Sequence, residues 1–528
     1  MANLSTGTSG EASSRAERAK KWARVIFRRR LLVIALLLIQ VGFLLILIAG
    51  YNLNFQYASW SLNIISIVVS LYILNKKEKS AYKLTWIFLI LMVPIFGGLL
   101  YIVFSSQSNP RKLRRQIETA NQLYRPLYQL PGNSLPALAD EQESCLPQVR
   151  YLQEYAGFPV YRHTQTEFFP SGEAFFEKLL PELEKAEHYI FLEFFILRPG
   201  KMLDPIIAIL ERKAREGLDV RIIYDDVGCF LSLPPNFKPW LEQRGIKCVI
   251  FGPFKPIWSS QQNNRDHRKI ISIDGKAAFT GGINLADEYI NAYERYGHWK
   301  DAGIMLEGDA AWSMTLIFLH TWNLEKAEKE KASAFYPWKH DACPVPSDGY
   351  VQPYADSPID DENVGEHVYI QIINNAKEYL YINTPYLVVD DNLLSALTLA
   401  AKSGVDVRII TPHRWDKWVV QITSRSYYRQ LVLAGVKVYE YTNGFNHSKT
   451  FVSDDRVATV GTTNLDFRSL YLHFEVGVWI YKNRAVSAVK EDFLRTVQQC
   501  HRITLKDCSR NAFQRILQDV LRLFAPLM

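Results

Sequence analysis

Two motifs that lie 180 residues apart contain the residues best suited to chemistry. The first reads HRKIISIDGKAAFTGGIN and the second reads HSKTFVSDDRVATVGTTN. Each has a histidine, a lysine two positions later, an aspartate, a Gly-Gly or Gly-Thr pair, and an asparagine. A lone histidine is usually structural, but a repeated pattern of this kind indicates a functional site. The shared residues are His267, Lys269, Asp274 and Asn284 in the first copy, and His447, Lys449, Asp454 and Asn464 in the second.

The spacing within each motif favours phosphodiester chemistry over metal hydrolysis. Side chains two apart on an extended strand share a face, so each histidine projects beside its lysine. The ammonium group repels a metal cation but attracts a phosphodiester, whose non-bridging oxygens gain charge in the transition state. One imidazole can attack phosphorus while the other protonates the leaving oxygen. We therefore expect neither a metal nor a cofactor, and the scattered cysteines show no zinc-type spacing.

Each motif also predicts a β-hairpin. Asp-Gly at 274 and Asp-Asp at 454 are turn-type dipeptides between apolar runs, and we expect them to form two-residue turns. That register places Gly282 opposite the first histidine and Thr462 opposite the second, with each asparagine diagonal on the same face. Each motif would thus supply half a pocket. The two aspartates either cap the turns or support the histidines, and the residues alone leave both roles open.

The region that carries the motifs is an internal repeat. Residues 187–226 align with residues 377–416, and each copy predicts a strand, an amphipathic helix and a second strand. We therefore expect an α/β fold in which two tandem halves, residues 151–340 and 341–528, contain mixed β-sheets that meet at a shared active site. The predicted strands span 189–195, 220–224, 379–384 and 407–411, and the predicted helices span 205–215 and 392–402.

Basic and apolar residues are concentrated in the first fifth of the chain. Residues 1–115 contain 16 Lys and Arg against three acids, whereas residues 116–528 contain 45 against 51. Three apolar segments, 31–50, 58–74 and 84–104, have basic clusters near their ends. These features predict a disordered basic tail over 1–30, N-terminal transmembrane helices that form an anchor over 31–104, and a linker over 105–150.

The predicted anchor places the protein in the cell membrane as a multi-pass protein, in contact with an anionic bilayer. Pro94 and the pair Gly97-Gly98 lie inside the third apolar segment and favour a broken or re-entrant helix, so the side on which the body lies stays open. The acidic body disfavours nucleic acid as a partner, because binding to DNA depends on a basic surface.

Two further segments are candidates for lipid contact. The aromatic segment 251–258 precedes the first motif. The predicted C-terminal helix either packs on the core or lies on a membrane, and its sequence is compatible with both. Its apolar stripe consists of Phe513, Ile516, Leu517, Val520, Leu521 and Phe524, with Arg515 and Arg522 off the stripe.

The paired motifs resemble those of the phospholipase D superfamily, and the resemblance covers nearly all of residues 150–528. More narrowly, NNRDHRK, IDGKAAFTGGINLADEYI, YGHWKDAGIMLEG, NHSK and VGTTNLDFRSLYLHFE, behind WIFLILMVPIFGGLLYIVF, resemble the bacterial cardiolipin synthase family. This resemblance implies that one histidine becomes a phosphohistidine, the other acts as acid and then base, and the lysines and asparagines bind phosphate. It also implies that Asp301 and Glu475 orient the histidines. Asn446 and Ser448 depart from the expected Leu and Ala.

The resemblance implies a phosphatidyltransferase. We expect the phosphatidyl group of one phosphatidylglycerol to pass to a second, giving cardiolipin and glycerol, with His267 as nucleophile and His447 as acid and base. The alternative is a membrane-bound phospholipase D-type phosphodiesterase that uses water or another alcohol as acceptor. A non-enzymatic membrane scaffold is a third hypothesis, which the complete motifs in both copies disfavour. The oligomeric state is not predicted.

Overall fold

The structure is a computed structural model, and it describes most of the chain beyond residue 52. The described ranges are 53–104, 111–132, 134–141, 143–253, 263–326, 329–337, 345–360 and 362–527, together with six isolated positions between 35 and 45. The predicted tail 1–30, most of the predicted segment 31–50 and part of the aromatic segment 251–258 lie outside these residues.

A seven-stranded mixed sheet forms the first half of the body. Its strands are β1 (Thr164–Phe169), β2 (Tyr189–Phe194), β3 (Asp219–Asp225), β4 (Lys247–Phe251), β6 (Lys269–Ile273), β7 (Ala277–Gly281) and β9 (Gly303–Gly308). Their order is β1-β9-β7-β6-β2-β3-β4, in which β2, β3 and β4 are parallel and the other neighbours are antiparallel. The accompanying helices are α8 (Gly172–Glu184), α9 (Leu203–Arg215), α10 (Asp226–Cys229), α11 (Phe237–Glu242) and η3 (Asp287–Ile290).

The second half repeats this sheet. Its strands are β10 (Tyr350–Asp356), β11 (Tyr379–Asn383), β13 (Asp406–Pro412), β14 (Lys437–Tyr441), β16 (Thr450–Ser453), β17 (Val457–Gly461), β19 (His473–Tyr481) and β20 (Cys500–Arg502). Their order, β10-β19-β17-β16-β11-β13-β14-β20, is that of the first sheet with β20 added at the edge. The accompanying helices are α13 (Val364–Asn375), α14 (Asp391–Lys402), α15 (Trp418–Leu433), α16 (Phe467–Tyr471), α17 (Arg484–Val497), α18 (Ala512–Leu523) and η5 (Ala525–Leu527). A separate pair of short strands is β12 (Leu387–Val388) and β18 (Leu465–Asp466).

The repeated elements lie within two residues of their predicted bounds, but the hairpin register differs from the prediction. Ile273 pairs with Ala277 and Ser453 pairs with Val457, so each loop has three residues and not two. The register is therefore shifted by one residue, and Gly282 and Thr462 are not opposite the histidines. The first two residues of both loops adopt positive φ angles, as in a two-residue turn, and one further residue follows before the returning strand.

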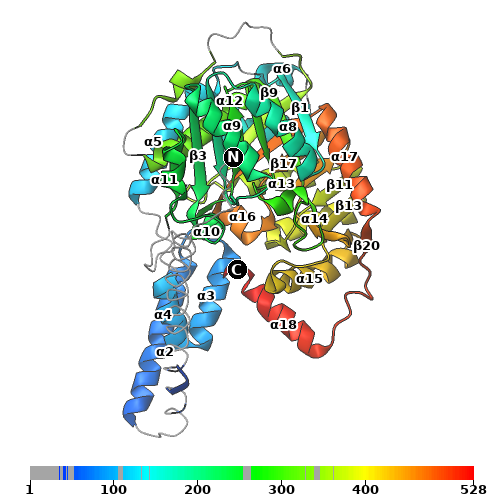
Figure 1. Cartoon of the computed structure of the whole chain (residues 1–528). Coiled ribbons are helices and arrows are strands. Elements are labelled where there is room, and N and C mark those ends of the chain that lie inside the picture. Colours follow the sequence, from blue (N-terminus) through cyan, green and yellow to red (C-terminus); the bar gives the residue numbers. More distant parts are fainter. Residues whose placement is uncertain are drawn as a thin grey trace.

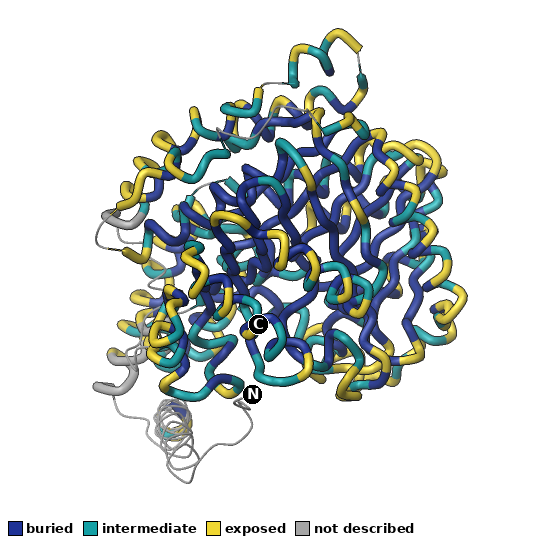
Figure 2. Tube along the Cα trace, turned by 45° about the horizontal axis from the view of Figure 1, so that its top comes forward, coloured by how far each residue is buried: buried dark blue, intermediate teal, exposed yellow. Residues whose placement is uncertain are grey.

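The two sheets share one apolar core. Helix α12 (Asp309–Glu325) is almost entirely buried between the sheets, where it packs on β6, β9 and β10. The helix α17 packs on β11 and β16 of its own sheet and on β1 of the other. Outer layers consist of α8, α9 and α11 on the first sheet and α13, α14 and α15 on the second. Figure 2 shows that buried residues fill this centre while exposed residues lie at its edge.

Two short strand pairs join the halves next to the motifs. Strand β5 (Arg265–Asp266) pairs with the start of β19, and His267 donates its backbone N–H to the Phe474 carbonyl at 3.0 Å. Strand β8 (His298–Lys300) pairs with β15 (Gly444–Asn446), and His447 donates its backbone N–H to the Lys300 carbonyl at 2.7 Å. Each histidine is thus fixed to a strand of the opposite half.

The prediction of transmembrane helices is wrong for the part of the chain that the structure describes. The N-terminal helices are α2 (Leu53–Leu74), α3 (Ser80–Met92) and α4 (Pro94–Phe104), which form a bundle that projects from the body (Figure 1). Across the described residues, no helix combines the length and the apolar character that crossing a membrane requires, so a multi-pass topology is not supported. The break between α3 and α4 falls at Pro94, and Gly97 lies so close to the Leu89 carbonyl that a Cβ atom would meet it at 2.4 Å.

The segment expected as a linker is largely helical where it is described. It contains α5 (Arg111–Tyr128), α6 (Leu135–Asp140) and α7 (Leu146–Arg150), followed by the π-helical turn η1 (Tyr151–Tyr155). Helix α5 lies against α12, since Trp312 donates to the Leu127 carbonyl at 2.8 Å and Asn323 donates to the Tyr124 hydroxyl at 2.7 Å. A 3-10 turn, η4 (Ala332–Phe335), follows α12.

Candidate active site

The predicted histidines and asparagines of both halves line one cavity. It has a volume of about 610 Å³ and contains His267, Asn284, His447 and Asn464 among its lining residues. Each histidine lies just before a hairpin, at the point where the short inter-half strand pair ends. The structure therefore brings the two predicted half-pockets together, although their hairpins lie about 180 residues apart in the sequence.

Each histidine contacts a carboxylate from the other half. The Nδ1 atom of His267 lies 2.9 and 3.0 Å from the two carboxylate oxygens of Glu475 on β19. The Nδ1 atom of His447 lies 2.7 Å from Asp301, which follows β8. Both carboxylates are completely buried. The inter-half strand pairs explain the exchange, because each of them runs a motif histidine alongside the strand that carries the opposing acid.

The carboxylates are held by different groups. The Thr462 hydroxyl donates to Glu475 and, in turn, accepts the backbone N–H of Val476 at 3.0 Å. Asp301 accepts the backbone N–H of Ala302 at 2.8 Å and a longer bond from the Trp299 indole at 3.4 Å. These bonds orient each carboxylate towards its histidine.

The motif lysines are buried beside the histidines. Lys269 donates to the His267 carbonyl at 2.7 Å, and Lys449 donates to the His447 carbonyl and lies 2.8 Å from Nδ1 of the same histidine. Burial lowers the pKa of Lys269 to about 8 and that of Lys449 to about 7. A bound phosphate anion would favour the charged form of both amines.

The two histidines have different electrostatic surroundings. Burial, Lys269 and Lys449 hold the pKa of His267 well below its usual value. Burial and Lys449 lower the pKa of His447 to about 4, although Asp301 acts in the opposite direction. Both rings therefore favour the neutral form in the free protein.

The ring contacts of the histidines also differ. His447 lies near the rings of Trp299, Tyr289 and Phe445, with centroids 5.2 to 5.9 Å away. His267 lies 5.1 Å from the ring of Phe195, on the other side of the cavity. Aromatic rings stabilise a nearby cation, so the three rings around His447 favour its protonated form when charge develops there.

The motif aspartates lie at the far ends of the hairpins. The carboxylate of Asp274 accepts three backbone N–H bonds, from residues 187, 188 and 189, at 2.7 to 2.8 Å. Asp454 accepts the equivalent three bonds, from residues 377, 378 and 379, at 2.8 to 3.0 Å. Neither aspartate lines the cavity. This geometry supports a capping role, in which each aspartate fixes the start of β2 or β11 against the turn of its own hairpin.

Both asparagines line the cavity, but their side chains differ in the hydrogen bonds that they make. Asn284 accepts the backbone N–H of Ile196 at 3.0 Å and donates to the Tyr289 hydroxyl at 2.7 Å. Asn464 donates to Asp466 at 3.3 Å, and its side-chain oxygen is buried without a hydrogen-bond partner among the described residues. Asn464 therefore has more freedom than Asn284 to reorient towards a ligand.

Sequence reasoning missed a third histidine at the site. His473 lines the cavity, and its ring centroid lies 5.5 Å from that of His267. It precedes Glu475 by two residues on the same strand, so the two side chains share a face, and this spacing was the available signal. Ligand atoms of His267, His473 and Glu475 lie within 4.8 Å of one another, as a metal site would require. The two buried lysines nearby oppose the binding of a cation there.

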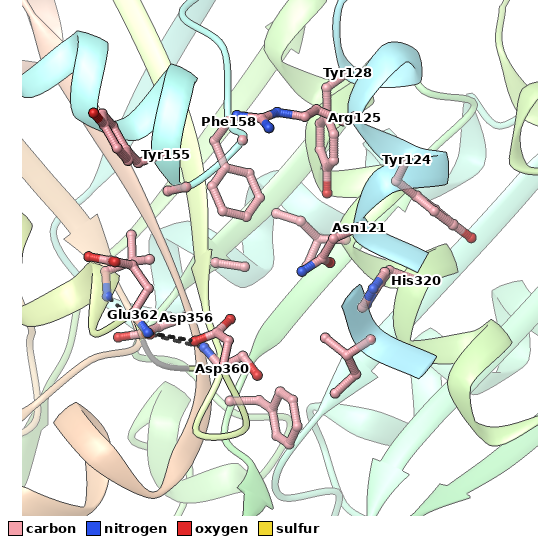
Figure 3. Close-up of a pocket in the computed structure, with 18 of the residues that line it drawn as sticks. Asn121, Tyr124, Arg125, Tyr128, Tyr155, Phe158, His320, Asp356, Asp360 and Glu362 are labelled. Carbon is pink, nitrogen blue, oxygen red and sulfur yellow. Dashed lines mark hydrogen bonds between the residues drawn. The ribbon is translucent and has the colours of Figure 1, made fainter. Parts of the chain in front are cut away.

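A second cavity has a volume of about 260 Å³ (Figure 3). Figure 3 shows Asp356, Asp360 and Glu362 on one side of it and Tyr124 and His320 on the other. Arg268 and Phe474, the chain neighbours of His267 and Glu475, also line it. None of the predicted site residues lines this cavity.

Comparisons with known proteins give one consistent result. A family model described as cardiolipin synthase, PLD-like domain, matches residues 369–497, and one described as phospholipase D-nuclease N-terminal matches residues 64–105. A cardiolipin synthase from Halalkalibacterium halodurans is 33% identical over 92% of this chain and 98% of its own length. An uncharacterised protein from Streptococcus mutans is 42% identical over 87% of this chain and 99% of its own. The solved phosphatidylserine synthase of Haemophilus influenzae, 16% identical, has a TM-score of 0.52 over 72% of this chain and 97% of that chain, which supports the fold alone.

Proposed function

The chain belongs to the cardiolipin synthase family and is a phosphatidyltransferase of the phospholipase D superfamily, and we propose that it works through a phosphohistidine on His267. The substrates are phospholipids. We further propose that both are phosphatidylglycerol, that the products are cardiolipin and glycerol, and that the enzyme is associated with the membrane that contains them. The crossed pairs, His267 with Glu475 and His447 with Asp301, are the observation that carries the mechanism.

In the first step, Nε2 of His267 attacks phosphorus, because Nδ1 is engaged by Glu475. The P–O bond to glycerol breaks, and His447, whose protonated form is favoured in the complex by the phosphodiester anion, gives its proton to the leaving oxygen. In the second step, neutral His447 removes the proton from a hydroxyl of the second phosphatidylglycerol. That oxygen attacks phosphorus, the P–N bond breaks, and His267 is regenerated.

The assignment of roles follows from the surroundings of each ring. A nucleophile must be neutral, and burial with two adjacent lysines keeps the pKa of His267 low. An acid must hold a proton, and Asp301 and three aromatic rings favour the protonated form of His447. We propose that Lys269, Lys449 and Asn464 bind the non-bridging oxygens, whose charge grows in the transition state.

The test is to trap the covalent intermediate with phosphatidylglycerol labelled in the phosphate. We expect His267→Ala to abolish both trapping and turnover. His447→Ala should lose about 10²–10⁴ in turnover but still form the intermediate from a phosphatidyl ester of p-nitrophenol, which needs no acid to leave. His413→Ala, which changes a histidine outside the cavity, is the matched control. Trapping that survives His267→Ala but not His447→Ala would reverse the roles.

The acceptor is tested by the products formed from phosphatidylglycerol alone. We expect cardiolipin and glycerol in equal amounts, measured by mass spectrometry. Free phosphatidate without cardiolipin would instead identify a hydrolase that uses water as the acceptor.

A further inference from the structure

Exposed apolar side chains lie close in the chain to residues that line the active-site cavity. Trp415 and Trp418 flank Asp416 and Lys417, which line the cavity, and both indoles are about half exposed, at 53% and 51%. Leu231, which is 85% exposed, follows α10, and α10 contributes Val227 and Gly228 to the lining. Tyr293, also mostly exposed, precedes the lining residue Arg295 by two positions. We call Leu231, Tyr293, Trp415 and Trp418 the mouth rim.

Helix α18 presents a second apolar surface beside the mouth. Phe513, Ile516 and Val520 recur every three to four residues on one face and are 75%, 62% and 45% exposed. The opposite face packs on α15, where Arg522 lies 4.2 Å from the ring of Tyr427. The predicted apolar stripe is therefore divided, and core packing explains only part of it. The next turn, η5, brings Ala525 to the cavity lining.

The surface of α18 is continuous with the N-terminal bundle. The Thr85 hydroxyl of α3 donates to the Leu523 carbonyl at 2.7 Å, and Phe88 lies 6.4 Å from Phe524. The bundle itself exposes many large apolar side chains, among them Trp60, Ile64, Val68, Leu71, Leu91 and Ile102. Figure 1 shows α18 and the bundle at the same end of the body, with the C-terminus between them.

An apolar surface of this extent marks an interaction site, and its chemistry favours lipid over protein. Tryptophan and tyrosine at its centre are the residues enriched at membrane interfaces. Lys506 and Arg515 are exposed beside the apolar face of α18, and Lys417 and Arg295 lie at the mouth. These cations match the anionic headgroups of a bilayer.

We propose that α18, the mouth rim and the exposed side of the α2–α4 bundle form one docking face for an anionic lipid leaflet, so that lipids enter the cavity directly from the leaflet. The docking face rests on the proposed function only for the identity of the lipid that reacts. Apolar side chains in the leaflet and cations at the headgroups would align the mouth with the depth of the phosphodiester.

The proposal is tested on the full chain with an environment-sensitive nitrobenzoxadiazole dye. The dye is attached to Ile516→Cys, to Trp418→Cys, and to Leu123→Cys on α5, which is similarly exposed but lies away from the docking face. The wild-type chain, treated in the same way, gives the background from native cysteines. We expect vesicles of equal parts phosphatidylcholine and phosphatidylglycerol to shift dye emission to the blue at 516 and 418 but not at 123.

Each other outcome of the dye experiment counts against the proposal. If dye emission at residues 516 and 418 matches that at residue 123, the docking face for lipid is refuted, and a protein partner is left as the occupant of α18. A blue shift of dye emission at residue 516 alone would exclude the mouth rim from the docking face. An equal shift with phosphatidylcholine alone would remove the preference for an anionic leaflet. The dye reports contact without turnover, so an inactive enzyme that docks would contradict the proposed function and not this inference.

An activity measurement separates docking from folding. We expect Ile516→Asp to lower turnover of phosphatidylglycerol in vesicles by about tenfold, because the change removes an apolar side chain from the lipid contact and adds a negative charge that the anionic leaflet repels. Turnover of monomeric short-chain phosphatidylglycerol should be unchanged, as should both activities of Leu123→Asp. Equal losses on the two substrates would mean that the variant damages the fold or the site, and not docking.

Discussion

The two halves of the molecule position equivalent histidine–carboxylate pairs through different contacts. In the second half, residue 462 of the motif is a threonine, whose hydroxyl holds Glu475 against His267. The matching residue of the first half is Gly282, where a Cβ atom would come within 2.0 Å of the Asp301 carboxylate. Glu475 is therefore held by a hydroxyl group, whereas Asp301 fits because residue 282 has no side chain.

This difference follows from the lengths of the two acids. Glutamate reaches further than aspartate, so its carboxylate needs a second contact to fix its orientation, and Thr462 supplies one. Aspartate is shorter, so the backbone near Gly282 must approach it closely for Asp301 to reach His447. The motif residue at this position thus matches the acid of its own half, and that acid in turn supports the histidine of the other half.

The largest expected effect on kcat comes from replacing each of the two acids with its neutral amide. We predict that Glu475→Gln and Asp301→Asn each lower kcat on the order of 10²–10⁴, because an amide neither fixes the histidine tautomer nor stabilises the imidazolium. The two variants should separate on the p-nitrophenyl ester: Glu475→Gln slows formation of the covalent intermediate, and Asp301→Asn does not. Rapid-quench kinetics measures this step.

The control for the acid variants is Glu440→Gln. It removes a buried carboxylate that lies 2.8 Å from Nδ1 of His413, outside the cavity. We expect its kcat to be unchanged. Equal slowing of the first step by both acid variants would show that the acids do not serve separate histidines.

A smaller effect is expected from Gly282→Ala. The added methyl group displaces Asp301, so we predict a loss of about 10² in kcat, since a misplacement of about 1 Å can cost this much. The variant should reproduce the step specificity of Asp301→Asn. Gly98→Ala, where a Cβ atom meets nothing within 4 Å, is the control. Unimpaired transfer by Gly282→Ala would refute the steric reading of this position.

The sequence predicted the sheets better than their connections. Strands over 189–195 and 379–384 were located to within a residue because apolar runs of β-branched and aromatic residues bounded by turns have few alternatives. The hairpin register was missed by one residue, because Asp-Gly and Asp-Asp suit both two- and three-residue loops. The apolar residues of segments 58–74 and 84–104 predict membrane spans, yet the segment 84–104 breaks at Pro94 into two short helices.

The crossed acids could not be derived from spacing. Asp301 and Glu475 lie 34 and 28 residues from the histidines of their own halves, and only the resemblance to a family indicated them. Their positions depend on β5 and β8, which are two and three residues long and pair only with the opposite half. Strands so short leave no periodic signal. His473 was missed for a related reason, because it belongs to neither motif and approaches His267 only through this pairing.

Removing one hydroxyl from the second half should have a modest effect. We predict that Thr462→Val lowers kcat about five- to tenfold, because the valine keeps the shape but loses a bond to a carboxylate worth about 1 kcal/mol or more. The loss should appear in formation of the covalent intermediate. Thr280→Val is the matched control, since that buried hydroxyl has no hydrogen-bond partner among the described residues. Similar losses in both variants would assign the effect to packing.

The smallest expected effect is a pH dependence of kcat/KM that differs between the lysines of the two halves. With a pKa of about 7 for Lys449 and about 8 for Lys269, kcat/KM should fall as pH rises through this range, because the neutral amines no longer bind phosphate. Stability should change in the opposite direction. Above pH 7 the unfolded chain binds more protons at these lysines than the folded chain, so the free energy of unfolding contributed by them rises with pH until about 10.4.

Arginine stays protonated throughout this range, so it distinguishes the two lysines. Lys449→Arg should leave a fall in kcat/KM near pH 8, set by Lys269, and Lys269→Arg should leave one near pH 7, set by Lys449. The expected separation is about one pH unit, measured with monomeric short-chain phosphatidylglycerol so that membrane binding does not contribute. Identical profiles for the two variants would mean that the lysines titrate as one group shared by both halves, because their charges interact across the cavity.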